Sequence, residues 1–303
     1  MVDELFDAQR ALLKKGVYLQ GYKDFFSCHS SYYKRPELVI LAGGRHYIDG
    51  LATCNKQYCS HYVKQYLCKV SKNMAKVNGF IQKEKLVPTM LTLTLPHSAT
   101  DRLKDLRLVL DKATRGFLAE SKNRLVKNIN QIVGNTGYVL RNEITYNERN
   151  GWNTHCHVLN LNRDNYSEIQ KSQLVDEFAH QLESSGFYLS RLDKYNIEKK
   201  GGLIHFRENS FDVTYLSKYD DDNPVNLALT HPEQYIEFAQ SFNITQKIPL
   251  VKFKNGLKSK VGISSEKKYQ NEQELRRIQI PDFLINQSPE YIEEWLEKEL
   301  SCS

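Results

Sequence analysis

The chain has 303 residues, a hydrophobic content of 40% and a formal net charge of +6, from 42 basic and 36 acidic side chains. This composition excludes a disordered chain, and the absence of any run of about 18 apolar residues argues against a membrane partner or span. Six cysteines are too few for a disulfide scaffold, which favours a reduced, cytoplasmic protein, and the mild basic excess permits a nucleic-acid partner.

The first half of the chain contains three periodic segments and one irregular stretch. Helices are expected over 1–15, 61–84 and 101–130, and residues 21–60 read as irregular. Between the second and third helices, Thr89 to Leu95 alternates as a strand does, which places the leucines in the core and Thr92 and Thr94 on the opposite side.

The second half begins with a predicted hairpin. Strands over 138–146 and 154–161 flank the pair Asn150–Gly151, a strong turn signal. The elements expected after it are a helix over 167–185, short strands near 187–191 and 203–207, a helix carrying Tyr215 and Tyr219, a helix over 232–242, a basic hairpin-like segment over 247–264, and an acidic helix from Ser288.

This order of elements predicts an α+β fold, with a mostly antiparallel central sheet covered by helices on one face. We expect three parts: an N-terminal helical segment with Cys and His residues over 1–85, a core over 86–223, and a C-terminal appendage over 224–303 with a basic segment and an acidic helix.

Two histidines predict a metal site. His155 and His157 project from the same face of their strand, and Cys156 points to the other. The hairpin brings the strand that holds Glu143 beside them. Two imidazoles and a carboxylate suit a divalent ion such as Mg²⁺ or Mn²⁺, which polarises a scissile phosphate. The alternative is a histidine pair without a ligand.

Two tyrosines are candidate nucleophiles. Tyr215 and Tyr219 are four residues apart, so a helix would place them on one face. A phenol has a pKa of about 10 and needs help to attack, which a metal ion and Lys218 would supply. The alternative is that the tyrosines form an ordinary core stripe.

Three segments in series, 90–95, 143–159 and 215–219, resemble the motifs of the HUH endonucleases, especially the rolling-circle replication initiators of small bacterial plasmids and single-stranded DNA phages. The resemblance implies a ferredoxin-like core that nicks one strand of single-stranded or hairpin origin DNA. It also implies a 5′-phosphotyrosine intermediate, a free 3′-OH that primes synthesis, and a host helicase and polymerase as partners.

The resemblance also implies roles for the tyrosines. Tyr219 aligns with the nucleophile of plasmid initiators, and Tyr215 falls where some members carry a glutamate that activates water. A tyrosine at that position resembles the two-tyrosine phage initiators and transposases, which favours repeated strand transfer over hydrolytic release.

A zinc site is a further possibility. The segment 54–61, with Cys54, Cys59 and His61, resembles the Cys-rich segment before the first motif of plasmid initiators, although Ser60 and His61 replace its proline and third cysteine. Cys28 or His29 would complete a tetrahedral structural set, with His46 and Cys68 as alternatives. The competing interpretation is scattered buried cysteines.

Basic clusters indicate DNA contacts. Lysines 64, 69, 72 and 76 follow one predicted helix, and Lys252, Lys254, Lys258 and Lys260 cluster in the appendage, where alternation puts the first two on one strand face. The function best predicted is a rolling-circle initiator. The alternatives are a two-tyrosine HUH transposase or relaxase, and a non-catalytic DNA-binding regulator on the same fold.

Overall fold

The computed structural model describes residues 2–14, 25, 28, 32–41, 46–51, 54–118, 132–133, 137–188, 202–208, 213–219, 222–243, 248, 250–254, 256–263, 274–279, 295 and 298. The chain divides into two compact units. The terminal unit combines Met1–Val63 with Ser264–Ser303, and the central unit is the continuous stretch Lys64–Ile263.

The terminal unit contains helix α1 (Val2–Leu13), as predicted, and an antiparallel sheet in the order β2-β1-β8. The strands are β1 (Tyr32–Leu41), β2 (His46–Leu51) and β8 (Glu274–Gln279). The expectation of an irregular stretch over 21–60 was therefore wrong. Pro36 interrupts the apolar alternation of β1 in the sequence. The β1–β2 register shifts between Tyr32 and Glu37, so proline, which has no N–H to donate, lies where the strands are not regularly hydrogen-bonded.

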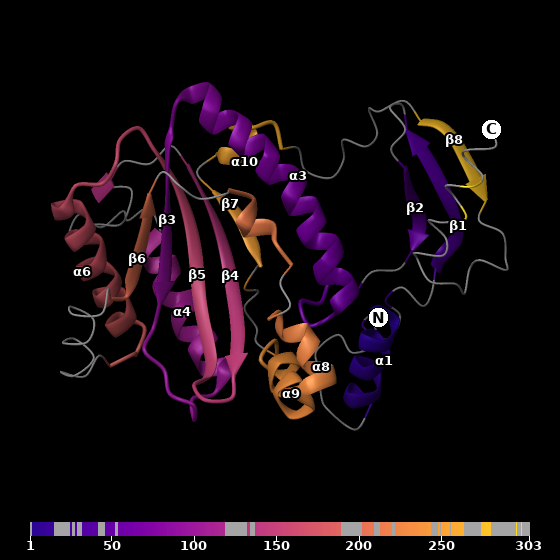
Figure 1. Ribbon diagram of the computed structural model, residues 1–303, viewed down its shortest axis with the longest axis horizontal. Helices are drawn as coiled ribbons and strands as arrows, with labels where there is room; N and C mark the ends of the chain where they lie inside the picture. Colours follow the sequence, from indigo (N-terminus) through magenta and orange to yellow (C-terminus); the bar gives the residue numbers. More distant parts are fainter. Residues whose placement is uncertain are drawn as a thin grey trace. The chain divides into compact units, whose positions relative to one another are not determined.

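The central unit is built on a five-stranded antiparallel sheet in the order β6-β3-β5-β4-β7 (Figure 1). The strands are β3 (Val87–Thr94), β4 (Gly137–Asn147), β5 (Gly151–Asn162), β6 (Ile204–Glu208) and β7 (Val251–Lys254). The α+β class and the β4–β5 hairpin are thus confirmed. Gly151 opens β5 with φ +74°, a conformation that glycine adopts without strain.

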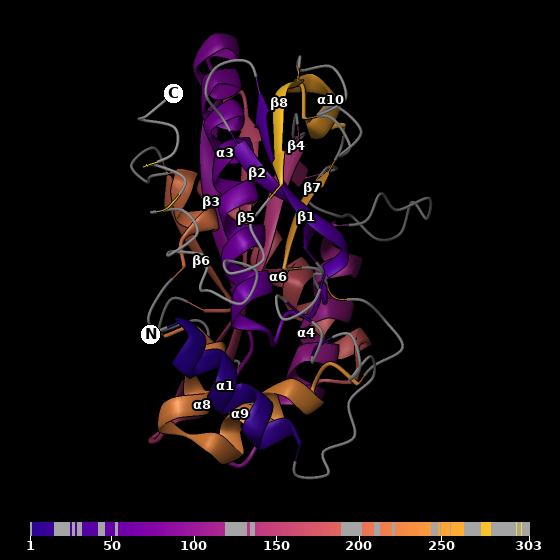
Figure 2. The same ribbon diagram turned by 90° about the vertical axis from the view of Figure 1, so that its right-hand side faces the viewer.

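Helices cover both faces of this sheet, so the expectation of helices on one face was wrong (Figure 2). Helix α3 (Ser60–Glu84) carries an apolar stripe at three- and four-residue spacing that packs on one face; the stripe consists of Val70, Met74, Val77 and Ile81. Helix α4 (Leu103–Leu118) packs on the opposite face beside α6 (Glu168–Ser184). An amphipathic helix must bury its stripe, and the open sheet face supplies the surface.

The remaining helices are η1 (Val213–Ser217), η2 (Pro224–Asn226), α8 (Leu227–Thr230), α9 (Pro232–Gln240) and α10 (Leu257–Lys260).

The pairing of β7 and β8 differs from the predicted domain division. The segment expected as a basic hairpin in an appendage instead supplies β7, which pairs with β4 and belongs to the central unit. Likewise β8 pairs with β1, so residues after 263 join the N-terminal segment rather than forming a separate part.

Other expected elements have mixed outcomes. The helices over 61–84, 167–185 and 232–242 and the strand over 203–207 are confirmed. Phe187 and Tyr188 are not in a strand, and the acidic helix from Ser288 and the end of the helix over 101–130 fall outside the described residues. In the described part of the chain, no helix combines the length and apolar character needed to cross a bilayer.

Candidate active site

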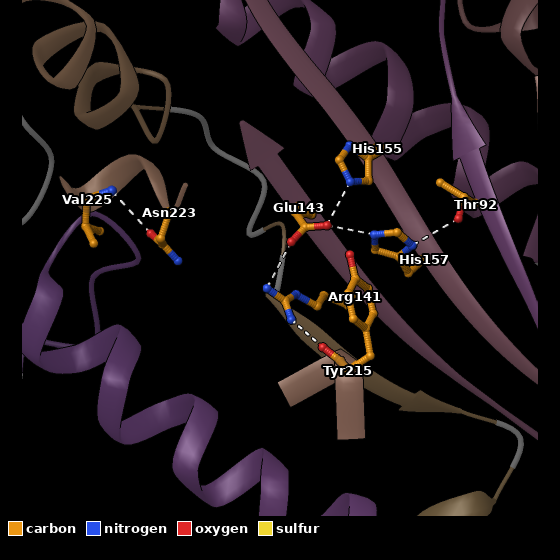
Figure 3. A network of polar contacts seen from close by, with 8 residues as sticks. All are labelled: Thr92, Arg141, Glu143, His155, His157, Tyr215, Asn223 and Val225. Atoms are coloured by element: carbon orange, nitrogen blue, oxygen red, sulfur yellow. Dashed lines mark hydrogen bonds and ion pairs between the residues drawn. The ribbon is translucent and has the colours of Figure 1, made fainter. Parts of the chain in front are cut away.

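Three metal-ligating side chains meet on the face of the sheet that α3 partly covers. Glu143 on β4 is directly opposite His155 on β5, and His157 follows two residues later on the same face. The Nε2 atoms of both histidines lie 2.7 Å from Glu143 Oε2 (Figure 3). The three ligand atoms all lie within 4.8 Å of one another. The structure therefore brings together the three residues that the sequence predicted.

Hydrogen bonds set the charge of this triad. Burial alone would raise the pKa of Glu143, but the hydrogen bonds from His155 and His157, with the nearby charge of Arg141, hold that pKa well below its usual range. Burial lowers the pKa of His157 and outweighs the opposing attraction of Glu143. The carboxylate is thus ionised and the His157 imidazole neutral at neutral pH, which are the forms that bind a cation.

Thr92 orients one of the imidazoles. Its Oγ1 lies 3.1 Å from His157 Nδ1, from the neighbouring strand β3, where Thr92 is directly opposite His157. A hydroxyl can donate to a bare ring nitrogen or accept from a protonated one, so this contact persists whichever tautomer is present. It directs His157 Nε2 toward Glu143. Such an outer contact is typical of a metal-binding histidine, and the donor set of two imidazoles and a carboxylate fits a divalent cation.

Arg141 links the triad to the tyrosine segment, and sequence reasoning missed it. The side chain is 3% exposed; Nη2 donates to Glu143 Oε1 at 3.1 Å and Nη1 donates to the backbone carbonyl of Tyr215 at 2.8 Å. Arg141 lies two residues before Glu143 on the same strand, so the alternation of β4 puts both on one face. The two-residue spacing between Arg141 and Glu143 is the sequence signal that could have identified Arg141 as part of the site.

Tyr215 lies at the triad. Its ring meets the His157 ring edge-on, with centroids 5.4 Å apart and an interplanar angle of 89°. Figure 3 shows its phenolic oxygen directed toward Glu143 and His157. The side chain is still 39% exposed, so it remains accessible from solvent. The triad, the arginine and this phenol form one connected site.

Tyr219 occupies a different environment. Its hydroxyl donates to Asn226 Oδ1 at 2.9 Å, and Lys64 Nζ lies 5.3 Å from its ring centroid. The prediction that a helix would set both tyrosines on one face was wrong, because η1 is a short 3-10 helix that ends at Ser217. Three residues per turn do not align positions four apart, and Tyr219 lies beyond the last turn. Lys218, between the tyrosines, is exposed.

The basic residues near β7 lie away from the triad. Lys252 and Lys254 share one strand face, as predicted, but Lys252 pairs with Leu140, which alternates with Arg141 on β4. These lysines therefore belong to the sheet face opposite Glu143, His155 and His157. There, burial and the charge of Lys254 lower the pKa of Lys252, although Asp111 of α4 opposes the shift. Lys258 and Lys260 are exposed on α10, and a role in DNA binding stays a prediction for all four.

A second cluster lies in the terminal unit. The sulfur atoms of Cys28, Cys54 and Cys59 lie within 4.8 Å of one another, and all three side chains are buried. Hydrogen bonding to Cys28 raises the pKa of Cys54 to about 12, and the contacts of Cys59 with both neighbours raise its pKa as well. His61 does not belong to this cluster; its ring packs edge-on against Phe6, with centroids 4.5 Å apart.

The structure does not describe the side chains of the alternative fourth ligands considered from the sequence. His29 is not described, and for His46 and Cys68 only the backbone is. The resemblance to HUH endonucleases rests on the sequence segments quoted above. Comparison of the chain with protein-family models, with curated proteins and with solved structures found no match.

Proposed function

We propose that the central unit is a metal-dependent, strand-specific DNA endonuclease and strand transferase that initiates rolling-circle replication. One observation carries this proposal: the phenol of Tyr215 stands edge-on to His157, beside a carboxylate on which two imidazoles converge. A buried ligand set next to a partly exposed nucleophile is the arrangement that phosphodiester cleavage by tyrosine requires.

Glu143, His155 and His157 would hold Mg²⁺ or Mn²⁺. When bound, the cation polarises the scissile phosphate and neutralises the charge that develops on its oxygens. The low pKa of Glu143 keeps its carboxylate ionised, and Thr92 holds the His157 ring in its orientation. Arg141 fixes the backbone of Tyr215 relative to Glu143, so that the phenol and the ligand set keep one geometry.

In the reaction, the tyrosine oxygen attacks phosphorus and the bond from phosphorus to the 3′ oxygen breaks. The proton lost by the phenol is balanced by the proton gained by the leaving 3′ oxygen, which yields a free 3′-OH and a 5′-phosphotyrosine. The phosphotyrosine link conserves the energy of the broken bond. Attack by a 3′-OH on that link reverses the step and religates the strand without ATP.

The two tyrosines would divide two successive transfers. In the structure Tyr215 is the phenol in place at the ligand set, whereas the family resemblance gives the first attack to Tyr219, whose hydroxyl is bonded to Asn226. The geometry favours Tyr215 for the first attack. The other phenol then serves in the second transfer.

The test uses the full chain, Mn²⁺ and end-labelled single-stranded oligonucleotides, including a random-sequence pool and hairpins. We expect a protein–DNA adduct that resists boiling in detergent. Tyr215→Phe should abolish the first adduct and Tyr219→Phe should leave it, while Tyr188→Phe, at a tyrosine that is 93% exposed, serves as the matched control. The reverse result for the two site tyrosines would restore the order implied by the resemblance.

Loss of the adduct in Glu143→Gln should accompany loss of Mn²⁺ binding. Absence of an adduct from every oligonucleotide, combined with tight binding to DNA, would overturn the endonuclease proposal in favour of a non-catalytic regulator.

A further inference from the structure

We propose that Cys28, Cys54 and Cys59 hold a structural zinc ion in the terminal unit. The three residues come from separate places in the sequence, yet Cys59 Sγ lies 3.6 Å from Cys28 Sγ and the backbone N–H of Cys54 points to Cys28 Sγ at 3.4 Å. None of these three cysteines is in a disulfide, and their exposed fractions are 0%, 3% and 0%. Buried cysteines that serve as small apolar side chains have no reason to converge sulfur to sulfur.

The local backbone fits this role. Cys54 and Cys59 are separated by four residues, within the spacing of zinc-binding cysteine pairs. The turn between them is closed by a hydrogen bond from the Cys59 N–H to the carbonyl of Lys56 at 3.0 Å, with Asn55 at φ +53°. Such a turn directs both thiols to one side.

The position of Cys59 opposes part of the rise in its pKa that the neighbouring thiols and burial cause. It directly precedes α3, and its carbonyl accepts the hydrogen bond from Val63 N that opens the helix. The amino end of a long helix carries a partial positive charge, which stabilises an anionic sulfur. A soft, thiolate-rich set of this kind selects zinc over Mg²⁺ or Mn²⁺, which prefer oxygen.

A zinc ion would cross-link distant parts of the terminal unit's chain. The residues of that unit that the structure describes as buried and apolar are Leu5, Phe6, Leu13, Phe25, Tyr58 and Val63, together with the cysteines. A metal that joins Cys28 to the segment with Cys54 and Cys59 adds its binding free energy to that of folding. A disulfide between Cys28 and Cys59 would require the sulfurs to approach to about 2.05 Å and would leave Cys54 unpaired. One zinc ion engages all three.

Purified full-length protein should contain one zinc ion per chain that resists dialysis against EDTA, measured by mass spectrometry of the metal. Treatment with p-hydroxymercuribenzoate, which reacts with thiols, should release that zinc into an indicator dye. This readout on the unaltered chain does not depend on whether a variant folds. It also involves no nuclease activity, so its outcome is independent of the proposed function.

Variants then separate the two metal sites. Cys28→Ser, Cys54→Ser and Cys59→Ser should each lose the zinc ion, whereas His61→Asn and His155→Ala should retain it. Cobalt in place of zinc should show a thiolate charge-transfer band, and its visible spectrum identifies the fourth ligand as sulfur, nitrogen or oxygen. Protein that contains no zinc, zinc that survives all three cysteine substitutions, or a Cys28–Cys59 disulfide in non-reduced peptides would overturn the proposal.

Discussion

Replacing Arg141 with methionine should uncouple the tyrosine segment from the candidate metal ligands. The substitution keeps the length of the side chain but removes a buried charge that bonds to Glu143 Oε1 and to the Tyr215 carbonyl. Removing one partner of a buried ion pair costs about 3–5 kcal/mol. Glu143 keeps its two hydrogen bonds to the imidazoles, so we expect the lower end, about 3 kcal/mol of unfolding free energy.

A double-mutant cycle isolates the pair. In a Glu143→Gln background, removal of Arg141 no longer leaves an uncompensated carboxylate, so its cost should fall to about 1 kcal/mol. The coupling energy is then about 2 kcal/mol. By contrast, Arg149→Met, at an exposed arginine in the β4–β5 turn, should change the unfolding free energy by less than about 0.5 kcal/mol.

The assay is urea unfolding of the full chain without metal, followed by tryptophan fluorescence. The chain has two tryptophans, one in each unit, so a Trp295→Phe background leaves Trp152, which is 2% exposed, as the reporter of the central unit. Equal costs for Arg141→Met in both backgrounds would show that the two side chains act independently, and the positioning role would have to be abandoned.

Three further outcomes are expected. Thr92→Val should weaken Mn²⁺ binding by about tenfold or more in calorimetry, because it releases the ring of His157, whereas Thr94→Val on the same strand face should not; equal affinities would contradict this role. Gly151→Ala should lower the unfolding free energy by about 3 kcal/mol, because φ is +74° and the added Cβ would lie 2.7 Å from a backbone carbon. Gly186→Ala should lower it by only about 1–2 kcal/mol, because the space around that position is open. Mn²⁺ at about 100 times its Kd should raise the unfolding free energy by about 2.7 kcal/mol, an effect that EDTA or His157→Ala removes.

The hairpin and its ligands could be predicted because their information is local. A period of two fixes which side chains share a face, and the pair Asn150–Gly151 fixes the register between the strands. Once that register is set, Glu143 must lie beside His155. No contact between distant segments was needed for this inference.

The tyrosine segment could not be predicted in the same way. Val213 and Thr214 are β-branched and weaken a helix, and Leu216, which is fully buried in the core, anchors the single turn that forms. The bond from Arg141 to the Tyr215 carbonyl joins residues 74 positions apart. Contacts at that separation depend on tertiary packing, which local pattern does not encode.

The pairing of β1 with β8 could not be predicted from the sequence either. β1 contains Pro36 and does not alternate, and its partner β8 lies more than two hundred positions later. Similarly, β7 has only four residues, which is too short for a clear alternation pattern. Its lysines therefore led to the prediction of a solvated hairpin rather than an edge strand of the central sheet.

The pairing of β1 with β8 has a consequence for the order in which the chain folds during synthesis. The central unit is continuous and emerges from the ribosome before β8, so it can complete its sheet while β1 still lacks its second neighbour. Until β8 is made, β1 presents an open edge to other nascent chains. Removing β8 should therefore cause aggregation through β1 while leaving the proposed nicking activity of the central unit intact.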